Sequence, residues 1–378
     1  MRRIEIPQEA IERHRDTLGK EILSFLNRLA NRQSVIWNVD GGGSYIPTNA
    51  VNPQAVIGYW DWLYKEFKTK EILTATPYVI AKFAKDNENQ RQNLDPNDLT
   101  QIDETCGLLF NYAAFRESNV LVGPNTSGLI LWSQNKKHKA SWKEWGIAEF
   151  VRLLDVRYCP YCNAETVGTA RLPERIHVPD IDHIFPKMKY PLLSLSLYNL
   201  VPACNRCNSR FKKVKDMLEG WNVNHPLPSL HPYVHNSYKY IRFDYRPKSV
   251  GNLFIRPQVE DSPLTVSPVK DGDDRARCYL NDYHINEIYR DVYAEEINEM
   301  IRMEAICSKD FINTMRDLYE LDDSDFDKLF RRSSLDPRKI NHFRFAKLII
   351  DLHQAIGSDI NARKKREIEA RLREKFRL

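Results

Sequence analysis

Four cysteines stand in two C-x2-C pairs, which is a spacing typical of zinc sites. The first pair is Cys159 and Cys162, in "YCPYCN", and the second pair is Cys204 and Cys207. Two such pairs can supply four thiolates in a tetrahedron, the preferred structural geometry for Zn²⁺. A closed shell of four sulfurs leaves no position for water, so we expect this zinc to be structural. The alternatives are a redox pair of the thioredoxin kind or coincidence.

The 41 residues between the two pairs include an acid directly beside a histidine. This separation is longer than in an ordinary zinc ribbon, so we expect a further element to be clamped between the pairs. The stretch "RIHVPDIDHIFPK" (175–187) predicts a short strand with a bend, and it holds Asp182 and His183. Neighbours on a strand point to opposite faces. We therefore expect these two side chains to do different work.

These residue types suit hydrolysis of a phosphodiester with one divalent ion. A second short strand is predicted at "NLVPAC", which begins at Asn199, and Asn208 follows in the first turn of a helix predicted over 205–220. The Asp182 carboxylate and an asparagine carbonyl oxygen are hard ligands suited to Mg²⁺ or Mn²⁺. A neutral imidazole such as His183 can take a proton from water.

The helix predicted after the second cysteine pair is basic. The stretch "NRCNSRFKKVK" (205–215) contains no acid. We expect its cations to contact nucleic-acid phosphates. The residues are Arg206, Arg210, Lys212, Lys213 and Lys215.

The order CxxC, DH-I-x-P, N-L, CxxCN, basic helix resembles the HNH, or ββα-metal, endonuclease family. "CPYC…DIDHIFP…YNLVPACNRCNSRFK" looks like the cysteine-bearing form of that family, over about residues 160–215. The resemblance implies that His183 is the general base and that Asp182 and Asn208 hold the catalytic ion. It implies that Asn199 orients the histidine and holds the hairpin. The third family letter is here Asn208 rather than His.

Two other interpretations stay open at this point. Asp182 and His183 can simply cap a turn, with the asparagines serving the knuckle turns. The chain is then a zinc-knuckle protein that binds nucleic acid or an assembly partner through a vestigial site. The third hypothesis is a nuclease of the same chemistry that acts on RNA.

Composition and charge limit the class of protein to which the chain can belong. The hydrophobic content of 42% and the seven Trp are enough for a sizeable core, and the net charge of +5 does not by itself indicate a polyanion partner. The start "MRRIEIPQEAIERHRD" lacks the apolar region of a signal peptide, and no apolar run of about 18 residues predicts a membrane span. With seven cysteines, an odd number, we expect a reducing compartment, the cytoplasm.

Together these patterns predict an α+β fold in which a zinc-stapled ββα-metal core is flanked by mainly helical N- and C-terminal regions. Amphipathic or helical patterns occur at 8–33 and 98–117, and a capping box occurs at 141–144. The stretch 58–67 is densely aromatic, which favours packing in the core or against a partner over base stacking. The regions expected are helical 1–150, core 151–220, strand- and loop-rich 221–275, and helical 276–378 with a basic tail at 363–377.

The remaining chain resembles, more weakly, HNH effectors of bacterial anti-phage systems, including the Septu type. That resemblance implies phage or plasmid DNA as the substrate and a separate ATPase as partner. It rests on analogy of arrangement and not on individual residues. The chain itself has no P-loop or helicase motif, so any ATP-driven step would belong to another chain.

Overall fold

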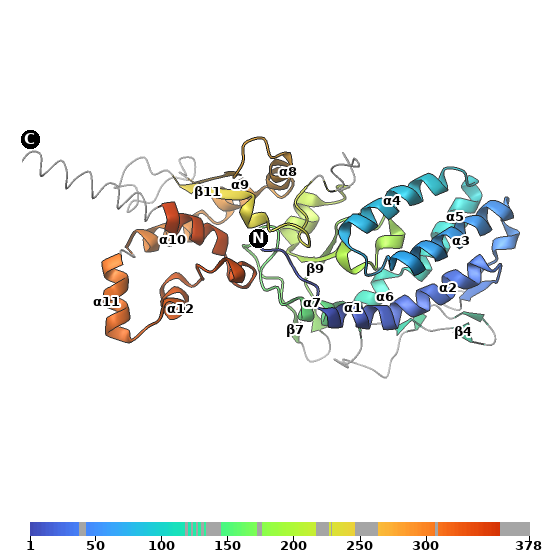
Figure 1. The fold of residues 1–378 in the computed structure, drawn as a ribbon, viewed down its shortest axis with the longest axis horizontal. Helices are drawn as coiled ribbons and strands as arrows, with labels where there is room; N and C mark the ends of the chain where they lie inside the picture. The colour runs from blue at the N-terminus through green and yellow to red at the C-terminus, as the bar shows by residue number, and fades with distance from the viewer. Residues whose placement is uncertain are drawn as a thin grey trace, which may run out of the picture. The chain divides into compact units, whose positions relative to one another are not determined.

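The fold was analysed in a computed structural model (Figure 1). The residues it describes are 1–37, 43–117, 120–121, 124–125, 128–129, 132–133, 145–171, 176–216, 227, 229–245, 264–306 and 309–355. The capping box predicted at 141–144 and the basic tail predicted at 363–377 lie outside these residues.

The chain divides into two compact units, each assembled from separate segments. The N-terminal unit comprises Ile4–Val156 and Val167–Pro228, and the C-terminal unit comprises Met1–Arg3, Arg157–Thr166 and Ser229–Leu378. The four regions predicted along the sequence stay a prediction.

The N-terminal unit is built mainly of helices. Its helical elements are α1 (Gln8–His14), η1 (Arg15–Gly19), α2 (Lys20–Ala30), η2 (Pro47–Asn49), α3 (Pro53–Lys70), α4 (Pro77–Arg91), α5 (Pro96–Leu109), α6 (Tyr112–Arg116), α7 (Ile147–Leu154), η3 (Pro191–Leu193), η4 (Leu197–Asn199) and η5 (Arg206–Lys212). The helix predicted over 8–33 is confirmed over α1, η1 and α2, with a π-helical turn at η1. The helix predicted over 98–117 is two helices, α5 and α6.

Side-chain caps explain where several of these helices begin. The Asn52 side chain accepts a hydrogen bond from the Ala55 backbone N–H at 3.2 Å, and Pro53 follows as the first residue of α3. The Asn111 side chain caps α6 in the same way, by accepting from the Ala114 N–H at 3.0 Å. Each cap satisfies a backbone donor that the helix itself leaves unpaired.

Aromatic residues of α3 fill the core of this unit, as the pattern at 58–67 predicted. Trp60 is fully buried, and its indole N–H donates to the Tyr45 hydroxyl at 3.0 Å. Trp62 stacks on Phe83 of α4 with ring centroids 5.7 Å apart. α2 packs along α3 (Figure 1), so the amphipathic face of α2 closes this core.

The strands of the N-terminal unit form short antiparallel pairs. They are β1 (Val35–Trp37) with β2 (Gly43–Tyr45), β3 (Val120–Leu121) with β6 (Trp132–Ser133), β4 (Pro124–Asn125) with β5 (Gly128–Leu129), β7 (Ala170–Arg171) with β8 (Ile176–His177), and β9 (Asp180–His183) with β10 (Leu200–Ala203). The pair β9 and β10, followed by η5, is the strand, strand, helix order predicted for 175–220. Its register sets Leu200 opposite His183 and Val201 opposite Asp182.

Among its described residues, the C-terminal unit holds one strand pair and a series of helices. Its elements are η6 (Ser237–Lys239), β11 (Ile241–Tyr245), β12 (Leu264–Pro268), α8 (Asp274–Asp282), α9 (Ile285–Glu287), η9 (Ile288–Val292), α10 (Ala294–Ile306), α11 (Lys309–Tyr319), α12 (Asp323–Phe326), η10 (Asp327–Arg331), η11 (Pro337–His342) and a helix at 346–355. β11 pairs with β12 in antiparallel fashion. The hydroxyl of Tyr289 donates to the Cys162 carbonyl oxygen at 2.6 Å, and Asn163 donates to the Ile340 carbonyl oxygen at 2.9 Å. The turn that carries the first cysteine pair is thus held by this unit's own helices.

The described residues therefore form a mainly helical α+β fold with small antiparallel hairpins, which confirms the fold class at that level. No helix among them combines the length and apolarity needed to cross a membrane.

His14 ties α1 to the loop that precedes β10. Its Nδ1 accepts a hydrogen bond from the Trp145 indole N–H at 2.8 Å, and its Nε2 lies 2.9 Å from the Leu195 carbonyl oxygen. An indole only donates and a carbonyl only accepts, so the ring is neutral with its proton on Nε2. Burial lowers the pKa of His14 to about 4.

This buried histidine predicts acid-sensitive stability. The unfolded chain takes up a proton near pH 6.5, whereas the folded His14 stays neutral until about pH 4. Its contribution to stability is therefore complete above pH 6.5 and declines as the pH falls towards 4. Between pH 7 and pH 5 the free energy of unfolding should drop by about 2 kcal/mol on account of this group.

Urea unfolding at the two pH values measures the effect. The variant His14→Gln should lose that share of the pH dependence, whereas His177→Gln, at an exposed position, should keep it. An unchanged pH dependence in His14→Gln would contradict the assignment.

Candidate functional site

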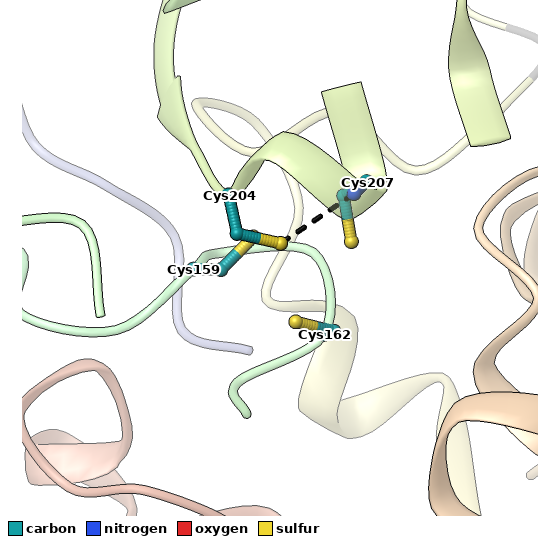
Figure 2. A group of neighbouring side chains, drawn as sticks. All are labelled: Cys159, Cys162, Cys204 and Cys207. Carbon is teal, nitrogen blue, oxygen red and sulfur yellow. Dashed lines mark hydrogen bonds between the residues drawn. The ribbon is translucent and has the colours of Figure 1, made fainter. Parts of the chain in front are cut away.

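The four predicted zinc ligands come together. Cys159, Cys162, Cys204 and Cys207 are all buried, and their sulfur atoms lie within 4.8 Å of one another (Figure 2). Backbone N–H groups point at two of the sulfurs, from Ala164 to Cys162 and from Cys207 to Cys204, each at 3.4 Å. The donor set is that of a structural Zn²⁺ site.

No second cluster of this kind exists in the part of the chain that the structure describes. There the four cysteines are the only group of three or more His, Cys, Asp or Glu side chains near enough to hold an ion together. A further ion at β9 would therefore depend on fewer protein ligands, with water and substrate completing its shell.

His183 ends β9 and is held from two sides. Its Nε2 lies 3.1 Å from the Ser194 carbonyl oxygen, and the Tyr112 ring meets it edge-on with centroids 4.4 Å apart. Because the carbonyl only accepts, Nε2 carries the proton, and the neutral ring keeps its lone pair on Nδ1. Burial lowers the pKa of His183 to about 4 against the opposing charge of Asp182. The ring is thus neutral at pH 7, in the form that can accept a proton.

Asn199 fixes the backbone around His183. Its side-chain oxygen accepts from the Phe185 N–H at 2.7 Å, and its amide donates to the carbonyl oxygens of Phe185 and Leu193, at 3.2 and 2.8 Å. Phe185 lies two residues after His183, and Leu193 directly precedes Ser194. The fully buried side chain therefore joins both ends of the segment that orients the imidazole.

Asp182 faces a partner that the sequence did not indicate. The Lys212 ammonium lies 2.8 Å from Asp182 Oδ1 and 2.8 Å from the His183 carbonyl oxygen, and the Lys212 and Asp182 side chains are only 1% and 2% exposed. The prediction that Lys212 contacts nucleic-acid phosphates was therefore wrong for this structure, since its charge is turned inward. Asp182 and His183 do have different partners, as their alternation along the strand predicts.

Asn208 lies on η5, which is shorter and wound differently than predicted. The segment is π-helical, with a hydrogen bond from the Lys213 N–H to the Asn208 carbonyl oxygen, and Lys213 ends it with φ of 52°. Of the helix predicted over 205–220, the described residues 205–216 form η5 at Arg206–Lys212, and residues 217–220 lie outside the part that the structure describes. Of the other predicted phosphate contacts, Arg210, Lys213 and Lys215 are exposed and Arg206 is half-buried.

A pocket of about 290 Å³ brings the candidate residues together. Asp182, His183 and Asn208 all line it. Its basic side chains are Arg116, Lys187 and Lys213. Asp180 lines the pocket too, so an anionic strand would meet positive charge around two carboxylates, an amide and a neutral imidazole, an arrangement suited to phosphodiester chemistry.

Sequence reasoning missed three residues of this site. Tyr112 and Arg116 come from α6, about 70 residues before β9, and no motif connects the two elements. Lys187, whose ammonium lies 4.9 Å from the centre of the Tyr112 ring, closes the "DIDHIFPK" stretch. Its place directly after the motif was the one signal that the sequence offered.

The cysteine cluster leads to a test by metal analysis. The purified protein should carry about one zinc per chain, as expected for four thiolates in one shell. Cys207→Ser should lose that zinc and much of the protein's thermal stability. Cys106→Ser is the control, because Cys106 is also buried but lies outside the cluster. Equal zinc content in the two variants would contradict the assignment.

The Asn199 contacts predict a large loss of stability on truncation. Asn199→Ala removes three hydrogen bonds of a buried amide and leaves their backbone partners unpaired, so unfolding should become easier by about 3 kcal/mol or more. The control is Asn205→Ala. Its exposed amide donates to Asp180, and its removal should cost less than about 0.5 kcal/mol. Denaturant unfolding that ranked the two variants equal would rule out this role.

Comparison with protein-family models gave no match for this chain, and comparisons with curated proteins and with solved structures gave none either. The resemblance to HNH endonucleases therefore rests on the motif between Cys159 and Lys215.

Proposed function

We propose that the protein is a metal-dependent endonuclease of the HNH type that hydrolyses phosphodiester bonds in DNA. The observation that carries this proposal is the fixed imidazole of His183. Its Nε2 proton is committed to the Ser194 carbonyl oxygen, while Asp182 and Asn208 line the same pocket. The ring of the buried His14 is fixed in a similar way, so what favours a catalytic role for His183 is its place in the lining of this pocket.

In this proposal His183 takes a proton from the attacking water. The lone pair on Nδ1 is available because Nε2 is the donor to Ser194, and the neutral ring persists at physiological pH. Asn199 acts as a positioning residue, since it holds the backbone on both sides of the imidazole. Arg116, Lys187 and Lys213 would hold phosphates of the bound strand.

Asp182 and Asn208 would hold the Mg²⁺ or Mn²⁺ ion. Their carboxylate and amide oxygens match the hard ligands that these ions prefer, and both residues line the pocket. When bound, such an ion stabilises the negative charge that develops on the leaving oxygen. The zinc held by the cysteines has no such role, because four sulfurs fill its shell.

The biological role that we propose is defence against phage or plasmid DNA, with an ATPase as partner. It rests on the weaker resemblance to anti-phage effectors. A protein of a different class, a zinc-knuckle binder with a vestigial site, has the same cysteines in its favour and could use the same basic side chains, but it gives no role to the neutral His183 in the pocket.

A plasmid-cleavage assay with Mg²⁺ or Mn²⁺ tests the proposal. His183→Ala should reduce the rate of cleavage by about a hundredfold or more, because a general base contributes at least that much. His177→Ala is the matched control, since His177 is exposed on β8, and it should cut like the wild type. Asn208→Ala should also lose activity.

Three outcomes separate the hypotheses. Equal cleavage by the wild type and His183→Ala would contradict the mechanism. DNA binding without cleavage, unaffected by His183→Ala, would favour the zinc-knuckle binder. Cleavage of structured RNA in preference to plasmid DNA would favour the RNA-directed nuclease.

A further inference from the structure

Lys212 approaches Asp182 from inside the protein. Asp182 lines the 290 Å³ pocket, but Lys212 is not among the pocket's lining residues. The ammonium contacts Asp182 Oδ1 and the His183 carbonyl oxygen, both at 2.8 Å, and its side chain is 1% exposed. The carboxylate therefore stands between an internal cation and the open pocket.

A buried carboxylate needs a cationic partner. An ionised carboxylate without a partner is strongly disfavoured in the protein interior. Lys212 satisfies this need through η5, the segment that also carries Asn208. The contact to the His183 carbonyl oxygen additionally fixes the end of β9, so one side chain joins β9 to η5.

We propose that Lys212 is a resident cation of this site, which holds the Asp182 side chain in place at the pocket through their buried ion pair and weakens the binding of the divalent ion there. This inference rests on the proposed function, in which Asp182 is a ligand of that ion. Lys212 is thus a positioning residue and not a contact for the nucleic acid.

Removal of the Lys212 charge should have two opposing effects on the binding of the divalent ion. Without Lys212 the carboxylate loses its alignment, which weakens metal binding, but the ion no longer meets a positive charge behind its ligand. Two cations that share one carboxylate repel each other, and we expect this repulsion to outweigh the loss of alignment of one side chain. The ion should therefore bind more tightly.

The test compares Lys212→Met with the wild type by calorimetric titration of Mn²⁺, using protein with its zinc retained. The variant should bind Mn²⁺ about tenfold more tightly. Its thermal midpoint should be well below that of the wild type without Mn²⁺ and should recover largely when Mn²⁺ is added. Lys215→Met is the control for loss of a nearby exposed charge and should behave like the wild type in both measurements.

A second variant guards against a folding defect. In Lys212→Met/Asp182→Asn neither buried charge remains, so this protein should be more stable than Lys212→Met and should not respond to Mn²⁺. If the double variant were as unstable as the single one, loss of the Lys212 charge beside the Asp182 carboxylate would not be the cause, and the proposal would be overturned.

The outcomes also separate this inference from the proposed function. Unchanged or weaker Mn²⁺ binding by Lys212→Met, or binding by neither protein, would overturn the role of Lys212. Absence of DNA cleavage by the wild type would instead indicate that the nuclease requires a partner, while tighter Mn²⁺ binding by Lys212→Met would still support the resident cation.

Discussion

The buried ion pair between Asp182 and Lys212 is the interaction on which the candidate site depends. It joins β9 to η5 with the two charged atoms 2.8 Å apart. Breaking such a pair by removing one partner leaves an uncompensated charge in the interior, which is costly. Strand and helix segment are therefore fixed against each other. Asp180, two residues before Asp182 on the strand, adds a contact by accepting from the Asn205 amide at 2.9 Å.

A second layer of buried polar contacts holds the histidine. The Ser194 carbonyl oxygen meets His183, Asn199 pins the backbone beside both, and His14 holds the next carbonyl, that of Leu195. These side chains have fixed hydrogen-bond partners in the interior, where hydrogen bonds are strong and a change in side-chain orientation is costly. Helix α1 is thus connected to the site through His14 and the backbone that orients the imidazole of His183. The helix itself contributes no residue to the pocket.

Local sequence patterns predicted the structure well where residue type and residue spacing point to the same feature. The C-x2-C pairs predicted the cysteine cluster, and the periodicity of 8–33 predicted the first helical segment. The direction of Lys212 was not predictable, because "RFKKVK" is typical of a solvated basic face and the π-helical winding of η5 changes which side chains turn inward. Tyr112 and Arg116 reach the pocket only through tertiary packing of α6, which no sequence motif records.

Crystals of the protein grown with Mn²⁺ and a DNA duplex test the central claim most directly, because anomalous scattering locates the ion without assuming its ligands. The account predicts an anomalous peak in the pocket between Asp182 and Asn208, with Nδ1 of His183 facing the scissile phosphate and Lys212 behind Asp182. A peak only at the cysteines, or a phosphate backbone that bypasses His183, would contradict it.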